Sequence, residues 1–437
     1  MTYSTKWLLL TVCCGLAACS CGASRENKTN IGGLRFQSDE SSEAETPSVA
    51  VDRESVFNAA KLTAALLAAQ IHEDGRFTYW FDLNPARTYD DRYNILRHAG
   101  SLYALSQWDA LAPSPKVQQK ITQGLSYIQD CCVTNVSLEA QKNGVSPIVL
   151  AVGSFSAVHG SARPPVAKLG GTGLTLQAIS AALSIGISVS VSEEARRAMG
   201  RFIVAMQKED GSFYSKYRLD TETIDDDWQS LYYPGEAALG LVSLYELDGD
   251  LTWLNSANRA LLQLEAERRG IDEVPHDHWA MIATEGVLEH RENLSDEDVL
   301  RHLRHIRQIS AAILSRQRVN VASDVAGAFD NYGKTAPAAT RVEGLVAGYR
   351  ILQRHGEESD ESLRKQIRKS IERGILFLLR AQVSQGKHAG AIPRAVRPME
   401  KNLSGAKSFN RRLTEVRIDY LQHALSAWIG YLQIVPE

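Results

Sequence analysis

Two kinds of helical segment alternate along this chain, and the alternation runs through six rounds. One kind carries its apolar residues on a single face, and these segments lie near residues 54–70, 116–130, 192–207, 251–268, 295–317 and 359–382. The segment at 295–317 shows the pattern most clearly, with an apolar stripe formed by Val299, Leu303, Ile306, Ile309 and Ile313. The other kind is small or apolar on every side, and such a helix must be buried all round. The sequence therefore predicts six buried helices, each paired with a half-buried one.

Each buried segment begins with a polar cluster. The clusters occupy residues 97–104, 170–177, 233–240, 276–283, 340–347 and 418–425. Five of them carry an ionisable residue at a comparable position, whereas the cluster at 170–177 is rich in glycine. Glycines there fit either the close approach of a ligand to the backbone or the close packing of two helices.

A turn motif repeats at the ends of the one-sided segments. A glutamine is followed by a glycine and then by an aromatic or aliphatic residue, in 70–77 and 207–213 and more loosely after Gln317 and Gln382. Glycine commonly ends a helix in the left-handed conformation, so we expect Gly211 to have a positive φ angle. Gly100, inside a buried segment, should instead be required by close helix packing.

Twelve helices that alternate in this way suit two concentric rings. The pattern resembles the (α/α)6 toroid shared by six-hairpin glycosidases, polysaccharide lyases, sugar epimerases and terpenoid cyclases, and the resemblance covers residues 54–437. It implies an all-α fold of six inner and six outer helices. The stretch 131–168 departs from the pattern, and its Val, Ile, Ser and Gly content predicts a short β-hairpin or a long loop at the rim. An open solenoid of helical pairs is the alternative architecture.

The composition narrows the classes of function. The chain has 437 residues, of which 44 % are hydrophobic, and a net charge of −3; this balance favours a folded domain and argues against nucleic-acid binding. The polar clusters contain no cysteine, so we expect neither a metal nor another cofactor. The Asp-x-Asp-Asp motif of terpenoid cyclases is also absent. We expect Cys131 and Cys132 to be buried thiols and the protein to be a monomer.

The N-terminus has the pattern of a secretory signal. Lys6 precedes an apolar stretch that ends in Leu16-Ala17-Ala18-Cys19, which resembles a bacterial lipobox. The resemblance implies a signal peptide over 1–18 and lipid attachment at Cys19, and the Ser at position 20 implies the outer membrane. Residues 19–53 are polar and acidic, which predicts a flexible tether between the lipid anchor and a folded domain at 54–437.

The buried helices of such a toroid run the same way, so their polar clusters should meet in one pocket. Carboxylates on separate helices supply general acids and bases, and aromatic rings stack on sugars. The candidate catalytic residues are Glu236, Asp277, Glu343 and Asp419. The candidate substrate-binding residues are Asp91, Arg97, His98, Tyr233, His278, Trp279, Arg341 and His423. We expect the general acid to be Asp277, because Trp279 beside it can exclude water.

This residue set favours a protein that acts on a polysaccharide. A glycoside hydrolase with paired carboxylates is the first hypothesis, with an inverting spacing of roughly 6.5–9.5 Å between the carboxyl groups. A uronyl C5-epimerase or a lyase on the same barrel is the alternative, with Tyr233 or His278 moving a proton and Arg97 or Arg341 neutralising a carboxylate. A third hypothesis is a lipoprotein that binds or guides a polysaccharide without changing it.

The lipobox gives the first testable prediction. Cys19→Ala should abolish fatty-acid labelling and membrane fractionation, because that thiol is the expected site of lipid attachment. The domain should keep its thermal unfolding transition, since the tether separates it from the anchor. A variant that still labels with a fatty-acid probe would contradict the prediction.

Overall fold

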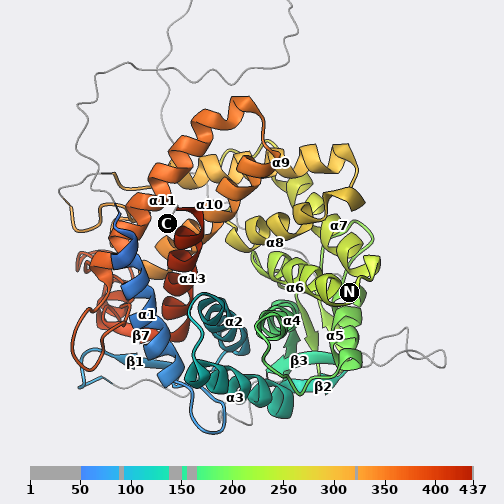
Figure 1. Ribbon diagram of the computed structural model, residues 1–437, viewed down its shortest axis with the longest axis horizontal. Helices are drawn as coiled ribbons and strands as arrows, with labels where there is room; N and C mark the ends of the chain where they lie inside the picture. Colours follow the sequence, from blue (N-terminus) through green and yellow to red (C-terminus); the bar gives the residue numbers. More distant parts are fainter. Residues whose placement is uncertain (1–50, 88–92, 137–149, 155–164, 320–322, 436–437) are drawn as a thin grey trace, which may run out of the picture. The chain divides into compact units, whose positions relative to one another are not determined.

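The structure is a computed structural model that describes residues 51–87, 93–136, 150–154, 165–319 and 323–435. The unit Ala50–Glu437 is a ring of helices (Figure 1). The outer helices are α1 (Arg53–Ala69), α3 (Pro115–Cys132), α5 (Glu193–Ala205), α7 (Leu251–Arg268), α9 (Asp296–Leu314) and α11 (Glu361–Ala381). The inner helices are α2 (Ile95–Leu111), α4 (Leu169–Ser184), α6 (Tyr233–Asp248), α8 (His278–Glu289), α10 (Thr335–His355) and α13 (Ile418–Ile434). The (α/α)6 toroid predicted from the sequence is confirmed.

The inner ring is closed. Each inner helix packs against the next in the order α2, α4, α6, α8, α10 and α13, and α13 packs back against α2. An open solenoid has no contact between its first and last repeats, so that alternative is wrong. No helix among the described residues is long and apolar enough to cross a membrane. The expected signal peptide over 1–18 and nearly all of the tether lie outside the described residues.

Glycines set the closest approach within the inner ring. A Cβ atom on Gly240 of α6 would lie 2.5 Å from the carbonyl oxygen of Gly173 on α4, and one on Gly173 would lie 2.3 Å from that of Glu236. The glycine-rich second cluster therefore serves helix packing. The expectation for Gly100 is also confirmed, because a Cβ there would lie 2.7 Å from the amide oxygen of Gln422.

The repeated turns follow four of the six outer helices and place each of these against the next outer helix. Gly75, Gly211, Gly327 and Gly390 all have positive φ angles, between +84° and +96°. In the second copy, the side-chain amide nitrogen of Gln207 donates to the carbonyl oxygens of Gly211 and of Ser256 on α7, both at 3.0 Å. A Cβ on Gly211 would lie 2.9 Å from the carbonyl oxygen of Arg259, also on α7. The motif thus ends one outer helix and holds it against the following one.

The expectation for 131–168 is only partly right. That stretch contributes β2 (Val133–Asn135), β3 (Leu150–Ser154) and β4 (Val166–Lys168), with 137–149 and 155–164 outside the described residues. These strands join β5 (Lys216–Arg218) and β6 (Thr223–Asp225) in a five-stranded antiparallel sheet. A second sheet pairs β1 (Trp80–Asp82) with β7 (Glu415–Arg417). The hairpin hypothesis missed the later strands, because three-residue strands give almost no alternation to detect.

Smaller elements complete the domain. A short helix, α12 (Ala406–Arg411), and two 3₁₀ turns, Arg291–Asn293 and Glu358–Asp360, lie in the connections. Asp52 caps α1 through bonds from the backbone nitrogens of Glu54 and Ser55, and the helix itself begins at Arg53, one residue before the expected one-sided segment. Cys131 and Cys132 are both free thiols, and only Cys132 is buried.

The turn geometry gives a second prediction. Gly211→Ala should lower the free energy of unfolding by about 1–3 kcal/mol, because its φ of +96° is strained for alanine and its Cβ would crowd Arg259. Gly186→Ala is the matched control, since its φ is +79° and no atom lies within 4 Å of the added Cβ. Urea unfolding should show the larger loss at Gly211. Equal losses would mean that contact with α7 does not matter.

Candidate active site

A pocket of about 610 Å³ opens where the inner helices begin. Its wall comes from the first turns of α2, α6, α8, α10 and α13, whereas α4 contributes only Leu174. The predicted convergence of the polar clusters is therefore confirmed for five of the six inner helices. The volume lies in the range typical of small-molecule sites.

The structure divides the predicted site residues into three groups. Eight of them line the pocket: Arg97, Tyr233, Glu236, His278, Trp279, Arg341, Asp419 and His423. Three do not, namely His98, Asp277 and Glu343. Of these three, Glu343 is hydrogen bonded to the lining residue His423. Asp91 lies outside the described residues. The four candidate carboxylates consequently do not all face one cavity.

Asp277 is displaced from the pocket by its role as a helix cap. One carboxylate oxygen accepts a bond from the backbone nitrogen of Ala280, and the other accepts from Arg268 at 2.8 Å. The side chain is fully buried in this ion pair. An N-cap side chain turns back toward its own helix, so it cannot also reach a substrate. The expectation that Asp277 faces the cavity is wrong.

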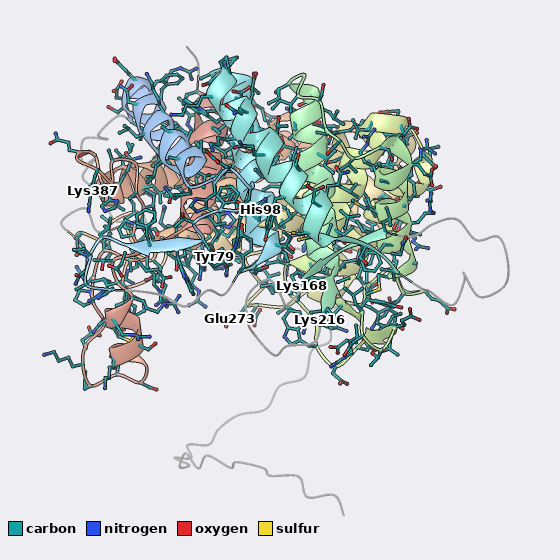
Figure 2. The ribbon with its side chains drawn as sticks, turned by 90° about the horizontal axis from the view of Figure 1, so that it is seen from below. Tyr79, His98, Lys168, Lys216, Glu273 and Lys387 are labelled. Carbon is teal, nitrogen blue, oxygen red and sulfur yellow. The ribbon has the colours of Figure 1, made fainter. Side chains whose placement is uncertain are left out.

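His98 is also structural. Its Nδ1 is hydrogen bonded to the hydroxyl of Tyr93 at 2.7 Å, and its Nε2 to the carbonyl oxygen of Gly124 at 2.9 Å. The ring stacks on Tyr127 and lies among the helices in the interior of the domain (Figure 2). With both nitrogens engaged and no exposed surface, His98 cannot bind a substrate as expected from the sequence.

Asp419 is a permanently ionised wall residue. Arg417 binds its two carboxylate oxygens at 2.5 and 2.9 Å, and Arg97 approaches at 3.1 Å. Burial opposes ionisation, but the two guanidinium groups outweigh it and hold the pKa of Asp419 at about 2. Opposite charges at this distance favour the charged form of a carboxyl group.

Glu236 is in the reverse situation. Burial, reinforced by the charge of Asp277, raises the pKa of its carboxyl group to about 8. Its Oε2 atom is buried and has no hydrogen-bond partner among the described residues. Gly170 leaves the space for it, because a Cβ on that residue would lie 1.8 Å from Oε2. Glu236 is therefore a protonated carboxyl group at neutral pH, and it lines the pocket.

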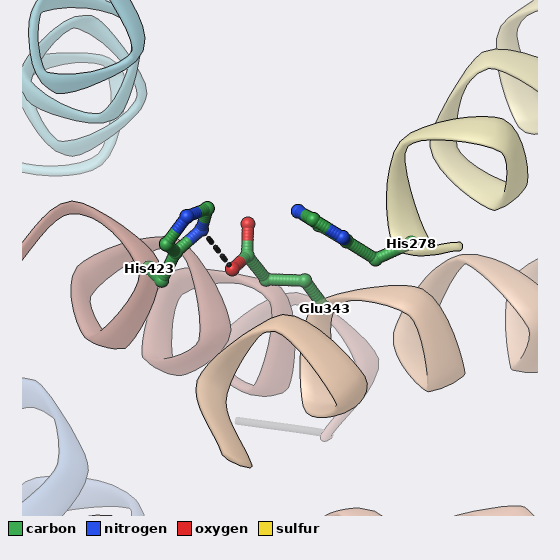
Figure 3. Close-up of side chains that lie close together, drawn as sticks. All are labelled: His278, Glu343 and His423. Atoms are coloured by element: carbon green, nitrogen blue, oxygen red, sulfur yellow. Dashed lines mark hydrogen bonds and ion pairs between the residues drawn. The ribbon is translucent and has the colours of Figure 1, made fainter. Parts of the chain in front are cut away.

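Two histidines and Glu343 lie close together in one cluster (Figure 3). One ligand atom each from His278, Glu343 and His423 all lie within 4.8 Å of one another. Nδ1 of His423 is hydrogen bonded to the Glu343 carboxyl group at 2.8 Å. The two imidazole rings meet edge to face, with centroids 5.3 Å apart. Burial raises the pKa of Glu343, and His423 opposes that shift. When Glu343 is ionised, it accepts from Nδ1 and leaves Nε2 of His423 as the base.

His278 is a neutral imidazole. Burial, with smaller contributions from His423 and Arg341, lowers its pKa well below the usual value. Neither ring nitrogen has a hydrogen-bond partner among the described residues, although the side chain is only 3 % exposed. Buried nitrogens are normally bonded, so an unpartnered pair in a pocket wall points to a ligand or a substrate.

The cluster fits two chemistries. Two imidazoles and a carboxylate are the donor types of a three-ligand metal site. The same groups can also move a proton, because a neutral imidazole oriented by a carboxylate is a general base. No metal is expected from the sequence, because that expectation rests on the lack of cysteine in the polar clusters and leaves aside a set of His and Glu ligands.

Four cationic lining residues were missed. They are Lys334, Arg394, Arg412 and Arg417. Arg417 directly precedes the sixth polar cluster and could have been found from that position. Lys334 and Arg394 lie on loops that meet at an isolated bridge between Lys334 and Ala395. No periodic pattern marks such a loop contact, so the sequence offered no signal for it.

No family model and no curated protein matches the chain. Solved structures match over most of their length at low identity. Cellobiose 2-epimerase from Bacillus thermoamylovorans has a TM-score of 0.60 and 11 % identity, covering 87 % of this chain and 100 % of that one. D-Mannose isomerase has a TM-score of 0.56 and 10 % identity, covering 88 % of this chain and 98 % of that one. The GH76 α-mannanase of Bacteroides thetaiotaomicron has a TM-score of 0.53 and 11 % identity, covering 87 % of this chain and 96 % of that one. The chain shares the six-hairpin (α/α)6 toroid fold with these enzymes.

Glu236 gives a third prediction. Its folded pKa of about 8 exceeds the usual value of 4.5 for a glutamate, so the folded state keeps a proton that the unfolded chain releases. Stability from this group is complete below pH 4.5 and is lost as the pH rises to about 8, at up to roughly 1.4 kcal/mol per pH unit. Glu236→Gln should therefore gain stability relative to the wild type across this interval.

Urea unfolding between pH 5 and 9 measures that difference. Asp419→Asn is the contrasting variant, because it breaks an ion pair and should lower stability throughout the same range. A Glu236→Gln curve that stays parallel to that of the wild type would show that the buried carboxyl group is ionised.

Proposed function

We propose that this protein is a carbohydrate-active isomerase or epimerase that moves a proton at a sugar carbon next to a carbonyl group. The observation that carries the proposal is the close pair of imidazoles of His278 and His423, with Glu343 bonded to Nδ1 of His423. Two of the structures that share the fold are named as a sugar isomerase and a sugar 2-epimerase, which supports a saccharide as the substrate.

The proposed reaction uses the substrate and the imidazole of His423. Nε2 of His423 takes the proton from the carbon next to the carbonyl, and the electron pair moves to the carbonyl oxygen to give an enediolate. The imidazolium of His423 then returns the proton to carbon, while His278 stays neutral and is available to hydrogen bond the sugar. Return to the other face of the same carbon gives an epimer. Return to the former carbonyl carbon, with the hydroxyl proton passing to the former carbonyl oxygen, gives the isomer. The step balances, because His423 gives back the proton that it takes.

Glu236 suits the stabilisation of the enediol oxygen. A protonated carboxyl group in a poorly solvated wall donates a hydrogen bond to the oxygen where negative charge develops. The pKa of about 8 keeps that proton in place at neutral pH. Glu236 thus takes the acidic role that the sequence analysis had expected of Asp277.

A glycoside hydrolase is the second candidate. One observation favours it: Glu236 and Asp419 line the same pocket, with pKa values of about 8 and about 2. Such a pair has the protonation states of a general acid and a general base. The two arginines that hold Asp419 reduce its basicity, so we rank hydrolysis second. A protein that binds a polysaccharide without catalysis is the third candidate. We also propose that the protein is an outer-membrane lipoprotein, and this placement rests on the Cys19 motif alone.

Isotope exchange gives a fourth prediction. In D₂O, the purified protein should incorporate deuterium into a saccharide next to its carbonyl group, detected by NMR of a panel of reducing sugars. His423→Asn should lower the exchange rate on the order of 10²–10⁴-fold, because it removes the base. His302→Asn is the control, since that buried histidine lies on the outer helix α9.

Other outcomes identify the other candidates. Release of reducing ends without deuterium in the sugar, abolished by Glu236→Gln, would overturn the proposal in favour of hydrolysis. Exchange that a chelator removes and Zn²⁺ restores would assign the cluster to a metal. Saccharide binding with neither exchange nor cleavage would favour the third candidate, a protein that binds a polysaccharide without catalysis.

A further inference from the structure

Positive charge dominates the pocket. The lining side chains include six cations, Arg97, Lys334, Arg341, Arg394, Arg412 and Arg417, against the two carboxyl groups of Glu236 and Asp419. Glu236 keeps its proton at neutral pH, and burial lowers the pKa of His276 to about 4, so that imidazole is neutral. A pocket for an uncharged sugar has no need of this excess.

Three of the cations are already engaged with carboxylates. Arg412 binds both oxygens of Glu415 at 2.6 and 2.8 Å. Arg97 and Arg417 share Asp419, which leaves one positive charge uncompensated. These groups form a rigid wall, because each guanidinium has a fixed partner.

The other three cations have no carboxylate within ion-pair distance among the residues that the structure describes. Arg341 donates to Nδ1 of His276 at 2.9 Å and to the carbonyl oxygen of Pro337 at 2.8 Å. Lys334 and Arg394 both lie over the ring of Phe409, at 5.8 and 4.9 Å from its centroid. The bridge between Lys334 and Ala395 holds their two loops together.

Nearby acidic groups do not cancel this charge. Asp330 is close enough to interact with Arg341, but its carboxylate accepts bonds from the backbone nitrogens of Tyr332 and Lys334 and it does not line the pocket. Cations that are half-buried without an anionic partner lose hydration and gain little in return. An anion bound among them would restore that balance.

We propose that the saccharide substrate carries a carboxylate, as in a uronic acid, and that Lys334, Arg341 and Arg394 bind it. The inference takes the saccharide from the proposed function and adds its charge. Arg341 lies near both His276 and His278, which puts the anion beside the imidazole pair. The planar guanidinium groups match a planar carboxylate.

Titration calorimetry with matched sugars tests the substrate charge. The panel pairs neutral and uronic-acid disaccharides of gluco, manno and galacto configuration, with the corresponding sulfated sugars as a third arm. At least one uronic-acid member should bind more than tenfold tighter than its neutral partner. Its affinity should fall between 50 and 500 mM NaCl, as salt screens the charges.

Single variants locate the anion. Arg394→Gln and Lys334→Gln should each weaken uronic-acid binding on the order of tenfold, the usual effect of losing one hydrogen bond to a charged group. Lys387→Gln is the matched control, because this exposed lysine is not a lining residue and lies at the left edge of the domain in Figure 2. Thermal unfolding checks that each variant is folded.

The outcomes separate this inference from the proposed function. No preference for any uronic acid over its neutral partner, or a preference for the sulfated arm alone, would overturn the carboxylate. Unchanged binding in folded Arg394→Gln and Lys334→Gln would overturn its location. Tight uronic-acid binding with no deuterium exchange would support the inference while the proton-transfer function fails. Exchange into neutral sugars alone would do the reverse.

Discussion

The close contact between neighbouring inner helices is the constraint on which the rest of the domain depends. Gly173 and Gly240 bring the backbones of α4 and α6 together, and the ring closes only because α13 also packs against α2. Inner helices held side by side place their N-termini at one mouth. The unpaired N–H groups and the positive end of each helix dipole then face the same pocket. The mouth is therefore electropositive before any side chain is counted, and its arginines add to that field.

Carboxyl groups in this setting differ through their neighbours rather than their depth. Asp419 and Glu236 are similarly buried, yet arginines keep the first ionised, whereas for the second the cost of burial outweighs the cations Lys168 and Arg97 and leaves it protonated. Asp277 is deeper still and is committed to Arg268 and its own helix. One wall thus offers a fixed anion, a hydrogen-bond donor and two imidazoles. The proposed proton transfer at carbon uses the last two.

The helices could be predicted because the period of their apolar residues is repeated over many positions. The boundaries of the outer helix α7 and the start of α6 agree with the sequence to the residue. A shift of one position in the first turn of a helix changes the direction in which a side chain points. Asp277 at the N-cap turns back to Ala280, whereas His278, the next residue, lines the pocket. Short strands and the loop contact between Lys334 and Ala395 depend on partners distant in sequence, and no local pattern encodes them.

Charge and proton transfer are coupled in the proposed complex. Burial, followed by His423 and Arg341, lowers the pKa of His278, so that imidazole is a weak base. A carboxylate bound to Arg341 would offset the positive field at the imidazole and increase its affinity for a proton. Binding energy at the cations would in this way assist the chemical step, and a neutral sugar that fills the same volume could not supply it.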